Sequence, residues 1–230
     1  MTTPTPTPTT IGILGAGHVG GALARKLAAA GREVTLGHRR PLTELTEFTE
    51  AEAAQGDGTD GTIRLADQQT TAAVADIVVN ATPGDSALAR MAALRTELAG
   101  KILIDVSNAT THGPDGLPAD LCYPSGSLAE RLQQALPATR VVKTLNTMFF
   151  PVMTDPAALS TPPTAYLSGD DADAKAVAAA LLADLGWRPE WIEDLGDITT
   201  ARATEALILL VPHVLRRRGF SQPFAVSLAR

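Results

Sequence analysis

Three glycines near the start of the chain have the spacing of a phosphate-binding turn. Gly15, Gly17 and Gly20 form the pattern G-x-G-x-x-G, directly after the apolar run 11–14 and before an alanine- and leucine-rich segment, 21–30. Here the first glycine permits a tight turn, the second lets a pyrophosphate approach the backbone, and the third lets a helix pack close to a strand. The helix N-terminus would offer unpaired N–H groups and a positive dipole end to the phosphates. The pattern predicts a dinucleotide site; a simple strand–helix turn is the alternative.

The end of the next predicted strand, residues 33–36, indicates which dinucleotide binds. An NAD enzyme usually places Asp or Glu there, where the carboxylate binds the ribose 2′-hydroxyl. This chain has His38, Arg39 and Arg40 instead, and its next carboxylate is Glu44. Arginine forks match phosphate oxygens, so two guanidinium groups and an imidazole suit a 2′-phosphate. We expect NADP(H) rather than NAD(H), with a solvent-exposed arginine pair as the alternative.

Few side chains at the predicted strand ends could do acid–base chemistry. The polar candidates are Thr82, Asp85, Ser107, Asn108, Asn146 and Thr147. None of them forms a recognisable nucleophile–base pair. Lys143 could donate a proton, but it lies inside a predicted strand and can equally point away from the cleft. Hydride transfer between two stacked rings needs little proton chemistry from the protein, whereas a carbonyl or imine reductase usually needs a proton donor.

The elements that must position these residues alternate between strands and helices. We predict strands at 11–14, 33–36, 62–65, 76–81, 101–106 and 140–145, and helices at 21–30, 42–54, 68–74, 85–98 and 127–136. Residues 55–61 and 107–123 are expected to be irregular. Such alternation implies right-handed crossovers and a doubly wound (Rossmann) parallel α/β sheet. The ligand cleft should lie at the carboxyl ends of its strands.

The rest of the chain is expected to form a small C-terminal α/β domain over 161–230, after a Rossmann domain over 11–160. A linker candidate is 160–163, followed by strands at 165–167 and 191–193 and a helix over 171–185. Asp197 should cap a long helix over 198–217 that Pro212 kinks. Arg202 and Glu205 could pair on its surface. Its apolar run 206–211 should be buried against its own sheet or a partner, and we expect a homodimer through this helix.

Composition excludes several other classes of protein. The 230 residues are 45% hydrophobic with a net charge of −6, which disfavours nucleic-acid binding. The Thr/Pro-rich residues 1–10 are expected to be disordered and lack the features of a signal peptide. The longest apolar run is too short to span a bilayer, which takes roughly 20 residues. The single cysteine, Cys122, and four scattered histidines show no metal-ligand spacing, so we expect no metal and a cytoplasmic location.

From Ile11 to the C-terminus the chain resembles the NADP-dependent reductases of coenzyme F420, the F420:NADP oxidoreductase family, whose fold the STEAP reductase domain shares. The resembling stretches are the glycine turn and residues 37–40, 141–148, 168–171 and 194–202. The resemblance implies that Ala16, His18 and Val19 line the pyrophosphate turn and that His38, Arg39 and Arg40 surround the 2′-phosphate. It also implies that Ala81, Thr82 and Pro83 lie beside the nicotinamide ribose, and that hydride passes at Asn146, Thr147 and Met148.

The chain departs from archaeal members of that family where the second substrate would bind. Those members carry histidine at the position of Asn146, and relatives often read Asn-Pro-Leu where this chain has Ser107 and Asn108 in the loop after the fifth strand. Phe150 follows Met148 at the same place. Ser107, Asn108, Met148 and Phe150 are therefore our candidates for contacts with the second substrate. We expect an NADP(H)-dependent oxidoreductase whose second substrate is F420; the alternatives are a reductase of an imine, carbonyl or other small metabolite, and a non-catalytic NADP(H) sensor.

Overall fold

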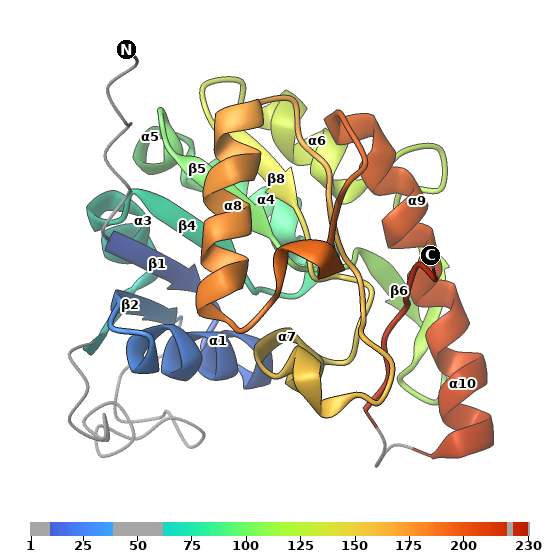
Figure 1. The fold of residues 1–230 in the computed structure, drawn as a ribbon. Coiled ribbons are helices and arrows are strands. Elements are labelled where there is room, and N and C mark those ends of the chain that lie inside the picture. Colours follow the sequence, from blue (N-terminus) through green and yellow to red (C-terminus); the bar gives the residue numbers. More distant parts are fainter. Residues whose placement is uncertain (1–9, 39–61, 220–222, 230) are drawn as a thin grey trace.

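A computed structural model describes residues 10–38, 62–219 and 223–229 (Figure 1). Several of the predictions above therefore fall outside the described residues. They are residues 1–9 of the Thr/Pro tail, Arg39, Arg40, the helix over 42–54 and the loop over 55–61. Thr10, which we had included in the tail, is instead the first residue of β1.

The centre of the fold is a six-stranded parallel sheet, as the sequence predicted, and its strands lie in the order β3-β2-β1-β4-β5-β8. The strands are β1 (Thr10–Leu14), β2 (Glu33–His38), β3 (Ile63–Asp67), β4 (Ile77–Asn80), β5 (Ile102–Asp105) and β8 (Arg140–Lys143). The order reverses between β1 and β4, where Ile11 pairs with Val34 on one side and Ile77 on the other. Ligands of open parallel sheets bind at such a reversal, outside the carboxyl ends of the strands.

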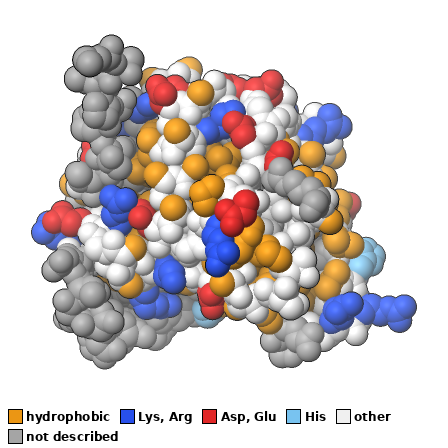
Figure 2. All heavy atoms as spheres, in the orientation of Figure 1, with side chains coloured by type: hydrophobic (Ala, Val, Ile, Leu, Met, Phe, Trp, Pro, Cys, Tyr) orange, Lys and Arg blue, Asp and Glu red, His pale blue; other side chains and the backbone are white. Residues whose placement is uncertain are grey.

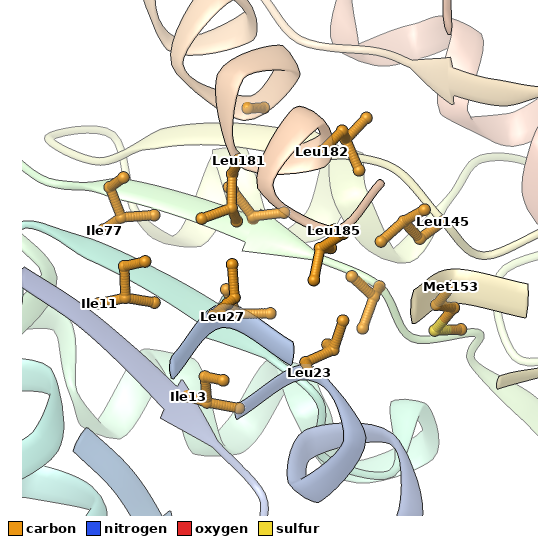
Figure 3. Packing of buried hydrophobic residues seen from close by; sticks show 14 of the residues in the cluster. Ile11, Ile13, Leu23, Leu27, Ile77, Leu145, Met153, Leu181, Leu182 and Leu185 are labelled. Carbon is orange, nitrogen blue, oxygen red and sulfur yellow. The ribbon is translucent and has the colours of Figure 1, made fainter. Parts of the chain in front are cut away.

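Helices cover both faces of this sheet, because alternate side chains of the buried strands point to opposite faces. On one face lie α1 (His18–Ala29) and α8 (Ala172–Asp184). Figure 3 shows side chains of these helices meeting the strands on that face: Ile11, Ile13, Leu23, Leu27, Leu181, Leu182 and Leu185. The other face packs against α3 (Gln68–Val74), α4 (Gly84–Ala93), α5 (Arg95–Leu98), α6 (Leu128–Ala135) and α9 (Ala201–Ala206).

The C-terminal region adds a small parallel sheet of β9 (Ala165–Leu167) and β10 (Ile192–Asp194). A short 3-10 helix, η3 (Pro189–Trp191), precedes β10. Because α8 belongs to the same hydrophobic cluster as β1 and α1, this region packs directly on the central sheet. Trp187 is buried there and donates its indole N–H to the carbonyl of Met153 at 3.0 Å. On the face shown in Figure 2, hydrophobic side chains gather over α8, which is rich in alanine.

Two predictions about local structure were wrong, and two short helices were not predicted. The segment 107–123 is not irregular throughout, because β6 (Thr110–His112) and β7 (Pro118–Leu121) form an antiparallel hairpin whose turn uses the positive φ of Gly116 (74°). The helix predicted over 85–98 is interrupted at Leu94, which separates α4 from α5. After β8, the unpredicted α7 (Phe150–Thr154) and the 3-10 helix η2 (Pro156–Ala158) each have a proline in their first turn, where its fixed φ suits a helix.

The last long helical segment, Ile198–Arg218, changes type along its length. It consists of η4 (Ile198–Thr200), α9, η5 (Leu207–Leu210) and α10 (Val211–Arg218). Asp197 caps its start by accepting from the N–H of Thr199 at 3.0 Å. Judged only on its 21 residues and a mean hydropathy of 1.3, the segment could cross a membrane, and 28% of its most apolar part is buried. Core helices of globular proteins share this length and hydropathy.

Candidate functional site

A cleft of about 800 Å³ opens at the carboxyl ends of the central strands, at the reversal of strand order. Most of the predicted ligand contacts that the structure describes line it: Gly15, Ala16, Gly17, His18, Val19, His38, Ala81, Thr82, Pro83, Ser107, Asn108, Met148 and Phe150. Three others, Gly20, Asn146 and Thr147, are buried behind the lining. Residues from three separate parts of the chain, 15–19, 81–84 and 106–108, thus meet in one place.

The three glycines of the turn have different surroundings. Gly15 has a φ of 111°, and a Cβ there would lie 2.6 Å from the carbonyl oxygen of Ala81. A Cβ on Gly20 would lie 1.8 Å from the carbonyl oxygen of Gly15, so this position fixes how closely α1 approaches β1. A Cβ on Gly17 would meet nothing within 4 Å. Gly17 is also the N-cap of α1, whose first N–H groups have no acceptor within the helix. Bare backbone at Gly17 therefore faces open space, as an incoming phosphate requires.

Side-chain hydrogen bonds fix the loop after β4. The side-chain oxygen of Asn80 accepts from the hydroxyl of Thr82 at 2.7 Å and from its backbone N–H at 3.2 Å. The side-chain amide of Asn80 donates to Asp105, on the neighbouring strand β5, at 2.7 Å. Gly84, the first residue of α4, lies so close to the next loop that a Cβ would be 2.1 Å from the carbonyl oxygen of Asn108. The loops after β4 and β5 therefore support each other at the cleft.

A reciprocal pair of amides joins the loop after β5 to the loop after β8. Asn108 donates to the carbonyl of Asn146 at 2.8 Å, and Asn146 donates to the side-chain oxygen of Asn108 at 3.0 Å. Leu145, just before, has a φ of 59°, which branched residues rarely adopt. The buried hydroxyl of Thr147 has no hydrogen-bond partner within the described chain. Asn146 therefore holds a residue of the cleft wall in place and does not itself line the cleft.

A row of aromatic rings crosses the cleft from the glycine turn to the C-terminal segment. His18 stacks on Phe150 with centroids 5.6 Å apart, Phe150 meets Phe149 edge to face at 5.0 Å, and Phe149 stacks on Phe224 at 6.3 Å. The N–H of Phe149 donates to the carbonyl of Phe224 at 2.9 Å, and that of Val226 donates to Thr147 at 3.1 Å. These bonds attach the C-terminal segment to the loop after β8.

The remaining wall of the cleft comes from residues that no sequence pattern selects. Ile208, Val211 and Leu215, on η5 and α10, line its apolar half together with Phe149 and Phe224. Arg90 and His112 lie on the polar side. These residues stand far from the glycine turn in the sequence and follow no motif spacing. The apolar run 206–211, which we expected to be buried against its own sheet or a partner, is partly exposed in the described chain, and Ile208 and Val211 contribute to a wall of the cleft.

The structure places Lys143 and Glu205 in one buried ion-pair network, which corrects the expected surface pair of Arg202 and Glu205. The amine of Lys143 lies 2.7 Å from Asp105 and 2.9 Å from Glu205, and its side chain is 1% exposed. Burial lowers the pKa of Lys143, but the two carboxylates raise it more, so the pKa lies above its ordinary value. Lys143 is therefore a buried cation behind the cleft wall and not a proton donor to a bound substrate.

Cys122 offers no catalytic or metal chemistry in this arrangement. It is half-buried, and burial together with the nearby carboxylate of Asp85 raises the pKa of its thiol, which disfavours the reactive thiolate. The described part of the chain contains no group of three or more His, Cys, Asp or Glu side chains that could hold a metal ion.

Comparisons with known proteins agree with this geometry. Residues 10–109 match the family described as "NADP oxidoreductase coenzyme F420-dependent". A crystal structure of a putative F420-dependent NADP reductase from Arthrobacter sp. FB24 superimposes with a TM-score of 0.83 at 38% identity, covering 96% of this chain and 99% of that one. The F420-dependent NADP reductase of Methanocaldococcus jannaschii is 26% identical over 202 residues, which are 86% of this chain and 87% of that protein.

The rat metalloreductase STEAP3 is 28% identical over 204 residues, although the chain spans only 36% of that relative's length. The likeness to the Arthrobacter protein extends over nearly the whole of both chains, and the matched family segment contains the glycine turn and the loops after β4 and β5. The chain is an oxidoreductase that belongs to the F420-dependent NADP oxidoreductase family.

Proposed function

We propose that this protein transfers hydride between NADP(H) and the deazaflavin ring of coenzyme F420. The observation that carries the proposal is the composition of the single cleft of about 800 Å³ described above. One end is bare backbone at a helix N-terminus, and the other is a wall of aromatic and aliphatic side chains. The first end suits a pyrophosphate and the second suits a flat ring.

The residues present fit NADP(H). Gly17 leaves room for the pyrophosphate, α1 directs its free N–H groups there, and Thr82 is held at the place that family resemblance gives to the nicotinamide ribose. When bound, NADP(H) supplies or accepts the hydride. The chain's own residues bind the phosphates, orient the nicotinamide end and exclude water from the apolar half of the cleft.

The composition of the apolar half favours a ring acceptor over a carbonyl or imine. Its walls include Met148, Phe149, Phe150 and Phe224, together with Ile208, Val211 and Leu215. No described residue lining the cleft forms a nucleophile–base pair. A deazaflavin needs close stacking more than it needs a proton from a side chain. The decisive experiment measures NADPH oxidation with oxidised F420, free flavins, and a panel of imines and carbonyls. Turnover of the panel without turnover of F420 would refute the proposal.

The choice of NADP over NAD rests on the end of β2. His38 lies there and lines the cleft, and Arg39 follows it in the sequence. Hydrogen bonds to a charged group contribute roughly 1.5–3 kcal/mol each. Arg39→Ala should therefore weaken NADPH binding by about tenfold or more and leave NADH binding almost unchanged. Arg188→Ala, at a guanidinium 66% exposed and outside the cleft lining, is the matched control. Equal weakening of both nucleotides would show that Arg39 does not select the 2′-phosphate.

We also propose that two copies associate through the outer face of the segment Ile198–Arg218. Leu210 on η5 is 52% exposed, one of the most exposed large hydrophobic residues in the described chain. Burying this side chain against a second copy would remove apolar surface from water. Sedimentation velocity over a wide concentration range tests the proposal, because a constant monomer mass would contradict it. Leu210→Glu should shift the equilibrium towards monomer.

A further inference from the structure

Three charged side chains from distant parts of the chain meet behind the cleft wall. Asp105 ends β5, Lys143 ends β8, and Glu205 lies on α9 near the C-terminus. All three are buried, and the lysine amine lies 2.7 Å from Asp105 and 2.9 Å from Glu205. None of the three lines the cleft. Isolated buried charges are strongly unfavourable, so such a cluster persists only where every charge has partners.

The carboxylate of Glu205 binds groups on two elements, β8 and α6. Its carboxylate faces Lys143 and also accepts from the backbone N–H groups of Leu128 at 2.8 Å and Ala129 at 3.2 Å, which begin α6. One lysine cation faces two carboxylates, and these N–H groups compensate the excess negative charge at a helix N-terminus. Glu205 therefore ties the C-terminal helical segment to α6 and to the end of β8.

The same network continues into the cleft wall through Ser107. The carboxylate of Asp105 accepts from the hydroxyl of Ser107 at 2.7 Å and from its N–H at 3.3 Å, while Lys143 donates to the carbonyl of Ser107. The backbone N–H of Ser107 is thereby held by the buried carboxylate of Asp105, and its carbonyl by the buried amine of Lys143. The next residue, Asn108, lines the cleft and forms the reciprocal amide pair with Asn146.

We infer that Glu205 is a positioning residue for hydride transfer, which acts through Lys143 to fix Ser107 and Asn108 in the cleft wall. A carboxylate on the C-terminal helical segment thus controls a loop of the nucleotide-binding sheet almost one hundred positions earlier in the chain. The effect of Glu205 on the rate of hydride transfer rests on the proposed function. Its role in fixing Ser107 and Asn108 does not.

Glu205→Gln tests the inference while preserving the size of the side chain. Glutamine offers one oxygen and one amide in place of two oxygens. Leu128 uses one oxygen of Glu205 while Ala129 and Lys143 share the other, so either Leu128 alone or Ala129 and Lys143 together lose their acceptor. We expect kcat with oxidised F420 to fall about tenfold or more, because small misplacements in a cleft can cost about a hundredfold. The KM and Kd for NADPH should change less than about twofold, since the glycine turn is untouched. Hydrogen exchange of residues 106–109 should accelerate.

Asp194→Asn is the matched control. Asp194 pairs with Lys175 at 2.8 Å, close to the 2.9 Å between Glu205 and Lys143, but its side chain is 54% exposed and away from the cleft lining. The control should leave kcat and exchange of residues 106–109 unchanged. Glu205→Asp keeps the charge on a shorter side chain and should retain more activity than Glu205→Gln. If Glu205→Gln does not fold, Glu205→Asp is compared with the parent by the same measurements.

Unchanged kcat and unchanged exchange of residues 106–109, with only a lower Tm, would overturn the inference and leave Glu205 a purely structural residue. If the parent protein does not reduce F420, the proposed acceptor is wrong. Hydrogen exchange with NADPH bound still decides the role of Glu205 in that case, because it needs no acceptor.

Discussion

A methyl group at Gly17 and one at Gly20 should have opposite effects, although the two glycines belong to the same motif. Gly17→Ala places a Cβ in open space, with nothing within 4 Å. Its φ of −87° and ψ of −167° are accessible to alanine. Gly20→Ala places a Cβ 1.8 Å from the carbonyl oxygen of Gly15 and 3.3 Å from the side chain of Ile13. The first change should therefore affect binding, and the second should affect folding.

The expected magnitudes follow from these distances. At Gly17, losing a glycine N-cap costs about 0.5–1 kcal/mol. Alanine also lowers the conformational entropy of the unfolded chain, which stabilises the folded state by about 0.4–1 kcal/mol. The two effects nearly cancel, so the free energy of unfolding should hardly change. The methyl group would instead stand where the pyrophosphate approaches, and losing one hydrogen bond to a charged group costs roughly 1.5–3 kcal/mol. NADPH binding should weaken by about tenfold to a hundredfold. At Gly20, the overlap with backbone should cost about 1–3 kcal/mol or more, since α1 must move from β1.

Thermal unfolding and NADPH titration of both variants test this reasoning. We expect the Tm of Gly17→Ala to match the parent within about 2 °C, and that of Gly20→Ala to fall by at least about 2–4 °C per kcal/mol lost. Gly31→Ala is a control for replacing a glycine with alanine. The φ of 82° at Gly31 strains alanine, but Gly31 lies just beyond the end of α1 that is remote from the glycine turn. If Gly17→Ala binds NADPH as tightly as the parent, the pyrophosphate does not pass over Gly17.

Three further outcomes are expected. Phe224→Leu removes one stacked ring at the end of the cleft remote from the glycine turn. Aromatic pairs contribute about 0.5–1.5 kcal/mol, so the KM for F420 should rise about 2–12-fold. The Kd for NADPH should stay constant. A change in the Kd for NADPH alone would contradict the assignment of Phe224 to the acceptor end of the cleft. Cys122 should react with a thiol reagent at about pH 8 more slowly in the folded protein than in urea, because burial raises its pKa. Equal rates would be inconsistent with its half-buried position. The pKa of Lys143 is higher in the folded protein than in the unfolded chain, where it is about 10.4. The ion pairs of Lys143 therefore stabilise the fold fully below about pH 10.4, and this stabilisation is lost as the pH rises through the folded pKa. The Tm should therefore fall above about pH 10.5, and a Tm that rises there would contradict the ion-pair network.

Local sequence was sufficient to predict the central sheet and the glycine turn that lines one part of the cleft. Continuous apolar runs marked the central strands β1, β4 and β5, because strands buried on both faces have no polar side. The glycine turn was recognisable because each glycine meets a separate steric requirement within six residues. Helices with a good cap, such as the one that starts after Asp67, were predicted to within a residue.

The hairpin β6–β7 and the short helix α7 were missed for a different reason. Each is three to five residues long, so it has too few positions to show a period. Turn residues surround both elements and make their sequences look irregular. What stabilises the hairpin is pairing between Thr110 and Leu121, which no local pattern encodes.

The apolar half of the cleft and the network around Lys143 were decided only by the tertiary structure. Lys143 was an uncertain residue in a strand until Glu205, 62 positions later, was placed beside it. Phe224 joined the aromatic row because the C-terminal segment returns to bond with Phe149. The sequence by itself determined the glycine turn, since that turn is built from consecutive residues whose backbone must take one form. The apolar wall of the cleft depends on side chains brought together by packing, and packing acts between residues whatever their distance along the chain.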